Sequence, residues 1–336
     1  MKVLIHSQFN AISRAGFGYG LTIKAEYGFW DRVIGFLTLI RPVFFVLTPL
    51  NAASAAVLAL NGYPSLKQCL LGFFTVAFAG CAVNVFNDYV DRERDKKIWQ
   101  TRAIPSGRVK PGEALLLVIL LFSASLLMSW FLFNPVTFFI LLLAGISGFV
   151  YSLYLRNKVG YLSLPPVIGL IYLGGWSAFS PQTLASSPLP WYLFLLGAVW
   201  QASHIMIYYP LHITSGTTNK IEERVPPALF FIPSLRAAVG IGIAFTIITI
   251  LISALLPLLT PLGILYLIIA LAYGIFTLIR GLRLFNDAQN REKGLKAFAS
   301  LSMFRMIISC AMLLSFFIYR FVQIPFVSIP LKWSWL

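Results

Sequence analysis

The segment from Leu66 to Lys97 reads LKQCLLGFFTVAFAGCAVNVFNDYVDRERDKK and changes character along its length. Its first part is apolar for about twenty residues, which is the length that an α-helix needs to cross the hydrocarbon core of a bilayer. Its second part holds four acidic side chains and contains no glycine or proline that would end a helix. The segment therefore predicts a membrane-spanning helix that carries acidic groups at one membrane surface.

The rest of the chain repeats the apolar pattern. Of its 336 residues, 59% are hydrophobic and only 11% are charged. Soluble domains carry about 25% charged residues, and disorder requires low hydrophobicity, so the composition excludes both classes. We expect an all-α polytopic membrane protein with nine transmembrane helices. They are expected near residues 42–61, 66–86, 113–133, 135–154, 164–180, 190–209, 237–257, 261–280 and 299–320.

Basic residues are distributed unevenly between the two sides of this arrangement. The N-terminal arm and every second loop together hold 22 of the 26 Lys and Arg residues. The opposite side receives Lys67, Arg320 and Lys332, and Arg305 falls inside the last span. The positive-inside rule then predicts a cytoplasmic N-terminus, an outside C-terminus and a location in the cytoplasmic or inner membrane. Because sidedness accounts for the net charge of +15, we expect no nucleic acid partner.

Three regions follow from this organisation. Residues 1–41 form an N-terminal cytoplasmic or interfacial arm, residues 42–320 form the nine-helix domain, and residues 321–336 form a short tail. Within the arm, residues 28–41 combine apolar side chains with charges at both ends. This pattern fits a helix that lies in the membrane interface, and it fits an early start of the first span equally well.

The acidic residues of the opening segment share a helical face. Asn84, Asp88, Asp91 and Asp95 are separated by four, three and four residues, which places them on one stripe. Carboxylates at the membrane edge are costly unless they face a cavity or bind a cation, and hard oxygen ligands suit Mg²⁺ bridged to a phosphate. The alternative is a solvated helix end with local ion pairs. We favour that alternative for Glu93 and its basic neighbours, and a metal site for the three aspartates.

A basic loop follows the acidic stripe. Residues 101–110 read TRAIPSGRVK, with a Pro-Ser-Gly turn between basic residues. Arg102, Arg108 and Lys110 are positioned to offer charge-assisted hydrogen bonds to phosphate oxygens. Taken alone, this loop would mean little, because basic loops on the cytoplasmic side are expected from sidedness.

The two segments together resemble the first aspartate-rich motif of the UbiA-type intramembrane prenyltransferases. The usual form of the loop in that family is Arg-Pro-Ile-Pro-Ser-Gly, and here Ala103 replaces the first proline. The sequence LIRP at residues 39–42 is similar to the family's entry segment. Tyr151 and Ser152, with Arg156 and Lys158, resemble the stretch that closes its fourth helix. Nine helices with the N-terminus inside are also the family's architecture.

The resemblance implies an enzyme that moves a prenyl group from a polyprenyl diphosphate to a hydrophobic acceptor of the aromatic, chlorin or glycerol-phosphate type. Mg²⁺ would be the cofactor, and the active site would open to the cytoplasmic side of the lipid bilayer. The aspartates Asp88, Asp91 and Asp95 would be the catalytic metal ligands. The residues expected to bind the diphosphate are Asn84, Arg102, Tyr151, Arg156, Lys158 and Lys220.

The family's second motif, commonly Asp-x-x-x-Asp after the sixth helix, is altered here. No aspartate occurs between Asp95 and Asp287, and His212 and Gly216 stand at the two expected positions. His212 could serve as a metal ligand or as a base. Glu222 or Glu223 could replace the missing carboxylates, and Lys220 could instead hold phosphate directly. A further alternative is a non-catalytic homologue that binds an isoprenoid or serves as a structural subunit of a membrane complex.

Overall fold

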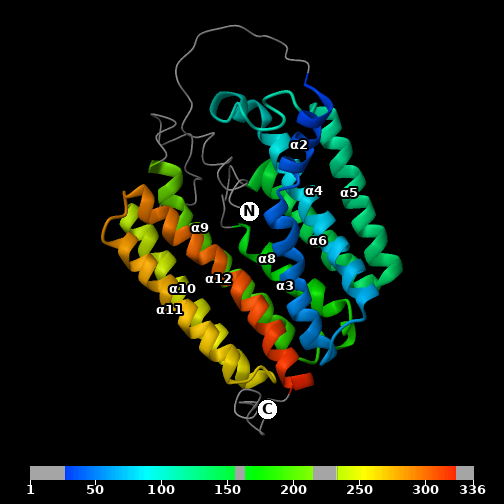
Figure 1. Ribbon diagram of the computed structural model, residues 1–336, viewed down its shortest axis with the longest axis vertical. Coiled ribbons are helices and arrows are strands. Elements are labelled where there is room, and N and C mark those ends of the chain that lie inside the picture. The colour runs from blue at the N-terminus through cyan, green and yellow to red at the C-terminus, as the bar shows by residue number, and fades with distance from the viewer. Residues whose placement is uncertain (1–26, 156–162, 215–231, 233, 323–336) are drawn as a thin grey trace.

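The computed structural model describes residues 27–155, 163–214, 232 and 234–322, and all regular structure in these residues is helical (Figure 1). Nine helices lie at the nine expected apolar segments. They are α3 (Pro42–Leu60), α4 (Leu66–Ile98), α5 (Pro111–Leu132), α6 (Pro135–Val150), α8 (Pro165–Ser177), α9 (Leu189–Thr214), α10 (Leu235–Leu259), α11 (Ile264–Phe285) and α12 (Arg291–Phe317). The shorter elements are α2 (Phe29–Leu39), the π-helical turns η1 (Tyr151–Leu155) and η6 (Ile318–Val322), and the 3₁₀ turn η3 (Pro181–Thr183).

Local sequence explains where these helices begin. Helices α3, α5, α6 and α8 each have proline at their first positions, where a missing backbone N–H leaves no helical hydrogen bond unmade. At the start of α4, Ser65 Oγ accepts a hydrogen bond from the backbone N–H of Gln68 at 3.3 Å. Asn134 Oδ1 accepts one from the N–H of Thr137 at 3.0 Å and so caps α6. The turn residues that separate the apolar segments are therefore also the helix caps.

The prediction of nine membrane crossings is confirmed only in part. By length and composition, seven helical segments of the described chain can cross a membrane, and the first of them joins α2 and α3. The 13-residue helix α8 extends about 20 Å, which is shorter than a hydrocarbon core of about 30 Å. Helix α9 is long enough, but Gln201, Ser203 and His204 lower its apolar character. The nine-crossing topology and its orientation stay predictions.

The nine helices form a closed ring. Each helix packs on the next one along the chain, and α12 packs back on α3. Contacts between α3 and α8 and between α9 and α12 cross the interior of this ring. The end of α4, the loop that follows it and the loop between α11 and α12 lie at the same end of the molecule as α2 (Figure 1). The acidic stripe therefore lies at that end of the bundle.

Helix α2 is separate from α3 and packs at this end. The chain turns at Arg41, whose backbone has φ 50° and ψ 79°. Leu39 is buried with Ile104 and Val109 of the loop after α4, in a core that also includes Val85 of α4. Because α2 and this loop pack on the same cluster, they fix each other's position beside the acidic stripe.

Candidate functional site

Helix α4 runs unbroken to Ile98 and holds the acidic residues on one buried face. Only 8% of Asp88, 4% of Asp91 and none of Asp95 is exposed. Asn84 is half-buried on the same stripe, one turn nearer the middle of the helix. In a solvated helix end these side chains would be exposed. Because the three aspartates are buried, the alternative of a solvated helix end does not account for them.

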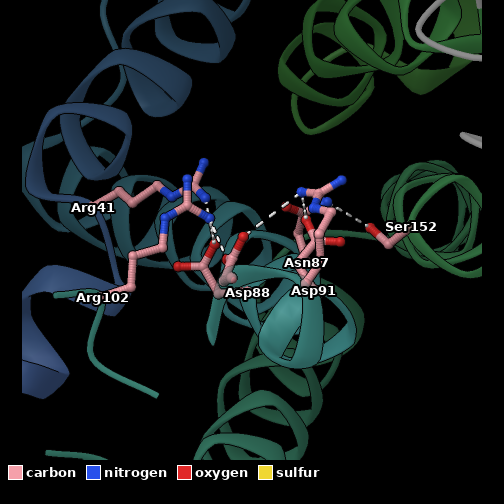
Figure 2. Close-up of polar contacts among 8 residues, drawn as sticks. Arg41, Asn87, Asp88, Asp91, Arg102 and Ser152 are labelled. Atoms are coloured by element: carbon pink, nitrogen blue, oxygen red, sulfur yellow. Dashed lines mark hydrogen bonds and ion pairs between the residues drawn. The ribbon is translucent and has the colours of Figure 1, made fainter. Parts of the chain in front are cut away.

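Two arginines from different elements reach the aspartates (Figure 2). The Nη2 atom of Arg41 lies 2.5 Å from Oδ1 of Asp88. The Nη1 atom of Arg102 lies 2.6 Å from Oδ2 of Asp95 and 3.7 Å from Oδ1 of Asp88. Hydrogen bonds between ionised groups are the strong ones in proteins. The residues before α3 and after α4 are thus tied to the acidic face.

A third arginine pairs with the remaining aspartate from the same helix. Arg94 Nη2 lies 2.8 Å from Oδ2 of Asp91, and half of the arginine side chain is exposed. Glu93 is exposed and pairs with Lys96 at 3.0 Å. The local ion pairing that we predicted for Glu93 and its basic neighbours is therefore present. The three buried carboxylates are matched by three guanidinium groups, which leaves the cluster close to neutral.

The loop after α4 positions Arg102 and uses its other basic residues differently. Ala103 is buried, and its carbonyl accepts a hydrogen bond from the N–H of Val109 at 3.1 Å. Gly107 has φ 84°, a conformation that side chains other than glycine rarely adopt. Arg108 donates a hydrogen bond to the carbonyl of Thr101 at 2.5 Å. This contact stabilises the loop and does not involve the aspartates. Of the three basic residues predicted for phosphate, Arg102 alone pairs with the acidic face.

The end of α6 is joined to the same face of α4. Asn87 Nδ2 donates to Oγ of Ser152 at 3.2 Å, and Ser152 donates to the carbonyl of Gly148 at 3.0 Å (Figure 2). Tyr151, which we predicted as a diphosphate-binding residue, is buried beside Ser152 in the π-helical turn η1. This link places the end of the fourth predicted span within reach of the acidic site.

The acidic face has the donor chemistry that suits a magnesium ion. The Oδ1 atom of Asp95 is buried, and no hydrogen-bond donor of the described residues reaches it. Within the same residues, no three His, Cys, Asp or Glu side chains converge closely enough to hold a metal by themselves. Mg²⁺ usually takes one or two carboxylates together with water and substrate phosphates. The site therefore fits a metal ion that a bound phosphate group helps to hold.

Several predicted residues lie outside this description. Arg156, Lys158, Lys220, Glu222 and Glu223 fall outside the described residues. His212 lies on the last turns of α9, and its side chain is also outside the description. Their predicted roles stay predictions.

Sequence reasoning did not assign Arg41, Asn87 or Ser152 to the site. Arg41 is 47 residues from its partner, so no helical spacing connects the two. The sequence signal that could have indicated Arg41 is the Arg-Pro pair at the start of the first span. Proline is common in the first turn of a helix, so the preceding arginine is expected at the helix end, near the membrane surface.

Comparison with known proteins gives the family. The profile of the UbiA prenyltransferase family matches residues 46–323. A 4-hydroxybenzoate octaprenyltransferase of Vibrio cholerae is 34% identical over 183 residues, which cover 52% of this chain and 58% of that protein. The chain thus matches little more than half the length of that relative. A protoheme IX farnesyltransferase of Desulforudis audaxviator is 28% identical over 280 residues, which cover 81% of this chain and 85% of that protein.

Solved structures share the fold. A digeranylgeranylglyceryl phosphate synthase superposes with a TM-score of 0.66 at 20% identity, covering 85% of this chain and 99% of that one. A UbiA homologue from Archaeoglobus fulgidus bound to DMAPP and Mg²⁺ superposes with a TM-score of 0.60 at 20% identity, covering 84% and 99%. The family match spans most of the helical ring and includes the whole acidic face of α4. This integral membrane protein belongs to the UbiA prenyltransferase family.

Proposed function

We propose that this enzyme transfers a prenyl group from a polyprenyl diphosphate to a hydrophobic acceptor, and that the acidic face of α4 binds the diphosphate. The observation that carries the proposal is the buried cluster in which Asp88, Asp91 and Asp95 meet Arg41 and Arg102. Charged side chains this close to the membrane interior are costly, and proteins keep them where they bind ions or substrates.

The carboxylates would hold Mg²⁺. Asp88, Asp91 and Asp95 are the ligands that we propose, and Asn84 supplies an amide at the inner end of the same stripe. A bound Mg²⁺ supplies positive charge that favours departure of the diphosphate from the allylic carbon. The Oδ1 atom of Asp95 lies 3.8 Å from Nη2 of Arg94 and accepts no hydrogen bond from the described residues, so such an ion would supply it with a direct ligand bond.

The arginines would change partners when the donor binds. Without a ligand, Arg41 and Arg102 compensate the charges of the aspartates. With the metal and diphosphate bound, the same guanidinium groups are placed to neutralise the charge that grows on the leaving diphosphate. Arg156, Lys158 and Lys220 add positive charge in this proposal. Tyr151, buried at the end of α6, lies on the element that closes the site beside Asn87.

A run of aromatic rings leads from this site into the bundle. Tyr208 lies 4.9 Å from Phe298, Phe298 lies 4.5 Å from His204, and His204 lies 4.7 Å from Trp200, all measured between ring centroids. We place Tyr208, six residues before the end of α9, at the end of this run nearest the acidic face. Aromatic faces stabilise cations, and a dry chamber prevents water from capturing an allylic cation. The run is therefore suited to line the path of the prenyl group.

The proposed class of acceptor is based on the names of the relatives. Their names indicate a phenolic acid in one case and a porphyrin in the other. We propose an acceptor of this aromatic or chlorin-like class, or a glycerol phosphate as in the solved synthase. His212, Glu222 and Glu223 are the candidates for activating it in place of the altered second motif. We place the site on the cytoplasmic side of the membrane, because the predicted topology puts the Lys- and Arg-rich loops, including the loop after α4, on that side.

The test is Mg²⁺-dependent release of diphosphate by the purified chain. Geranylgeranyl and longer prenyl diphosphates are supplied with pooled candidate acceptors, with and without EDTA. Asp91→Asn is expected to abolish release, whereas Glu93→Gln, which changes an exposed carboxylate on the same helix, is expected to leave it unchanged. Undiminished release by Asp91→Asn would remove the role assigned to the stripe. Tight donor binding without any release would instead indicate a binding homologue.

A further inference from the structure

A buried arginine lies in the middle of α12, away from the acidic face. Only 6% of Arg305 is exposed. Within the described residues it makes no hydrogen bond and no ion pair, and its guanidinium carbon lies 4.4 Å from the ring centroid of Trp200. An unpaired cation inside a helical bundle is costly, because it loses hydration without gaining a counter-charge. Its retention calls for a partner that the described residues do not supply.

A polar network surrounds this arginine. Asn51 of α3 is 1% exposed, and its Oδ1 atom accepts hydrogen bonds from Ser309 at 2.8 Å and from Tyr172 at 3.3 Å. The Nδ2 atom of Asn51 is buried and has no partner in the described chain. Ser309 follows Arg305 by one turn on α12, and His204 stacks on Trp200 with 4.7 Å between ring centroids. Helices α3, α8, α9 and α12, which contact one another inside the ring, thus contribute residues to this network.

This network is separate from the acidic face. Asn51 follows Arg41 by ten residues on α3, which corresponds to about 15 Å along the helix axis. Trp200 lies eight residues before Tyr208 on α9, or about 12 Å. The aromatic run from Tyr208 through Phe298 and His204 to Trp200 connects the two places. An acceptor whose reacting atom meets the prenyl group at the acidic face, and which extends about this far into the bundle, would have its far end near Arg305.

We propose that Arg305 binds a carboxylate of the hydrophobic acceptor, as a subsite of the transferase reaction proposed above. A guanidinium group offers parallel N–H donors that match the two oxygens of a carboxylate. The ring of Trp200 lies over the guanidinium group, and no acceptor of the described residues takes the guanidinium N–H groups. Arg305 is the one Lys or Arg that is buried within the described residues. A single positive charge balances a carboxylate, whereas a phosphate dianion would stay under-compensated there.

The test measures acceptor binding without any donor. The purified full-length chain is titrated with 4-hydroxybenzoate and with protoporphyrin IX, and with the methyl ester of each, by isothermal titration calorimetry. For at least one pair, the acid is expected to bind about tenfold or more tightly than its ester, as expected for a charge-assisted hydrogen bond. Arg305→Gln is expected to remove this preference, and Arg305→Lys to restore part of it.

The matched control is Arg280→Gln. Arg280 also lies over an aromatic ring, that of Phe276 at 5.1 Å, but on α11 and outside the network. This variant is expected to keep the preference for the acid. If neither acid is preferred over its ester, or if the preference persists in Arg305→Gln, the proposal is wrong.

Stability provides a second readout. Arg305→Met removes an unpaired buried charge and keeps much of the side-chain volume, so the ligand-free variant is expected to unfold at the same or a higher temperature. A lower unfolding temperature, with the preference for the acid intact, would show that Arg305 only packs on Trp200. Binding of a prenyl diphosphate with Mg²⁺ is measured on the same samples. If no prenyl diphosphate binds, the proposed donor site is wrong. The comparison of each acid with its ester would still show whether Arg305 binds a carboxylate.

Discussion

Arg41 places its Nη2 atom 2.5 Å from Oδ1 of Asp88 while its own backbone has φ 50°. Residues other than glycine rarely adopt this conformation, which costs about 1–3 kcal/mol and persists only where the surroundings enforce it. Here Pro42 begins α3 directly after it, and the buried Leu39 anchors α2 directly before it. The strained turn thus brings a guanidinium group from one helix junction to the acidic face of another helix.

Removal of this guanidinium group should affect the metal and the donor in opposite directions. In Arg41→Gln, Asp88 loses its nearer counter-charge and keeps only Arg102 at 3.7 Å, so Mg²⁺ alone is expected to bind more tightly than in the unchanged protein. The prenyl diphosphate is expected to bind about tenfold or more weakly, because a hydrogen bond to a charged group is lost. Calorimetric titration with Mg²⁺, and then with donor at saturating Mg²⁺, measures both.

Arg32→Gln is the matched control for this variant. Arg32 pairs with Glu113 at 2.6 Å at the same end of the bundle, but it does not reach the aspartates. Its donor affinity should be unchanged. Equal effects of the two substitutions would show that the Arg41 pair serves only to hold helices together.

The sequence made parts of this site predictable and concealed others for a physical reason. The stripe from Asn84 to Asp95 was readable because helical periodicity is local, and α4 is helical throughout. The pairing of Arg41 with Asp88 was not readable, because it depends on how α3 packs on α4. Arg305 was visible as a charge inside the last span, but its lack of a counter-ion is a property of four helices together.

The helical ring was readable for the same reason. Apolar length and breaker residues located all nine helices, because each signal acts within one segment. The length of α8 does not show whether this helix crosses the membrane. A 13-residue helix is shorter than the hydrocarbon core, and its depth in the membrane depends on the helices around it.

Removal of the metal should leave the fold intact. The three buried aspartates already pair with Arg41, Arg94 and Arg102. EDTA is therefore expected to abolish diphosphate release and to change the unfolding temperature little. Mg²⁺ and a prenyl diphosphate together should raise that temperature far more than Mg²⁺ alone, because a ligand stabilises the state that binds it. A large stabilisation by Mg²⁺ alone would show that the carboxylates form a complete metal site, against the donor-dependent site inferred here.

At Gly107 a larger side chain would strain the backbone, although it would not clash with neighbouring atoms. A Cβ atom at this position would meet its nearest neighbour at 3.7 Å, an ordinary contact, but φ is +84°. Gly107→Ala is therefore expected to destabilise the protein by about 1–2 kcal/mol through the backbone alone. Because the loop carries Arg102, donor affinity should fall as well. Gly112→Ala provides the comparison, since no atom lies within 4 Å of its Cβ and it belongs to α5. That variant should be as stable as the unchanged chain or slightly more stable in thermal unfolding.

Two adjacent glycines of α8 should respond very differently to the same substitution. A Cβ atom on Gly175 would lie 2.1 Å from the backbone carbonyl oxygen of Ala52, so α3 and α8 would have to separate. Overpacking typically costs about 1–3 kcal/mol, and here the obstacle is backbone that cannot rotate away. Gly175→Ala is therefore expected to lower the unfolding temperature markedly, whereas Gly174→Ala, whose Cβ would meet Ile140 at 3.7 Å, should change it little. Since Asn51 directly precedes Ala52 and bonds to Tyr172 of α8, separation of these helices should also disturb the network around Arg305. Equal unfolding temperatures for the two variants would contradict the close crossing of α3 and α8 on which that network depends.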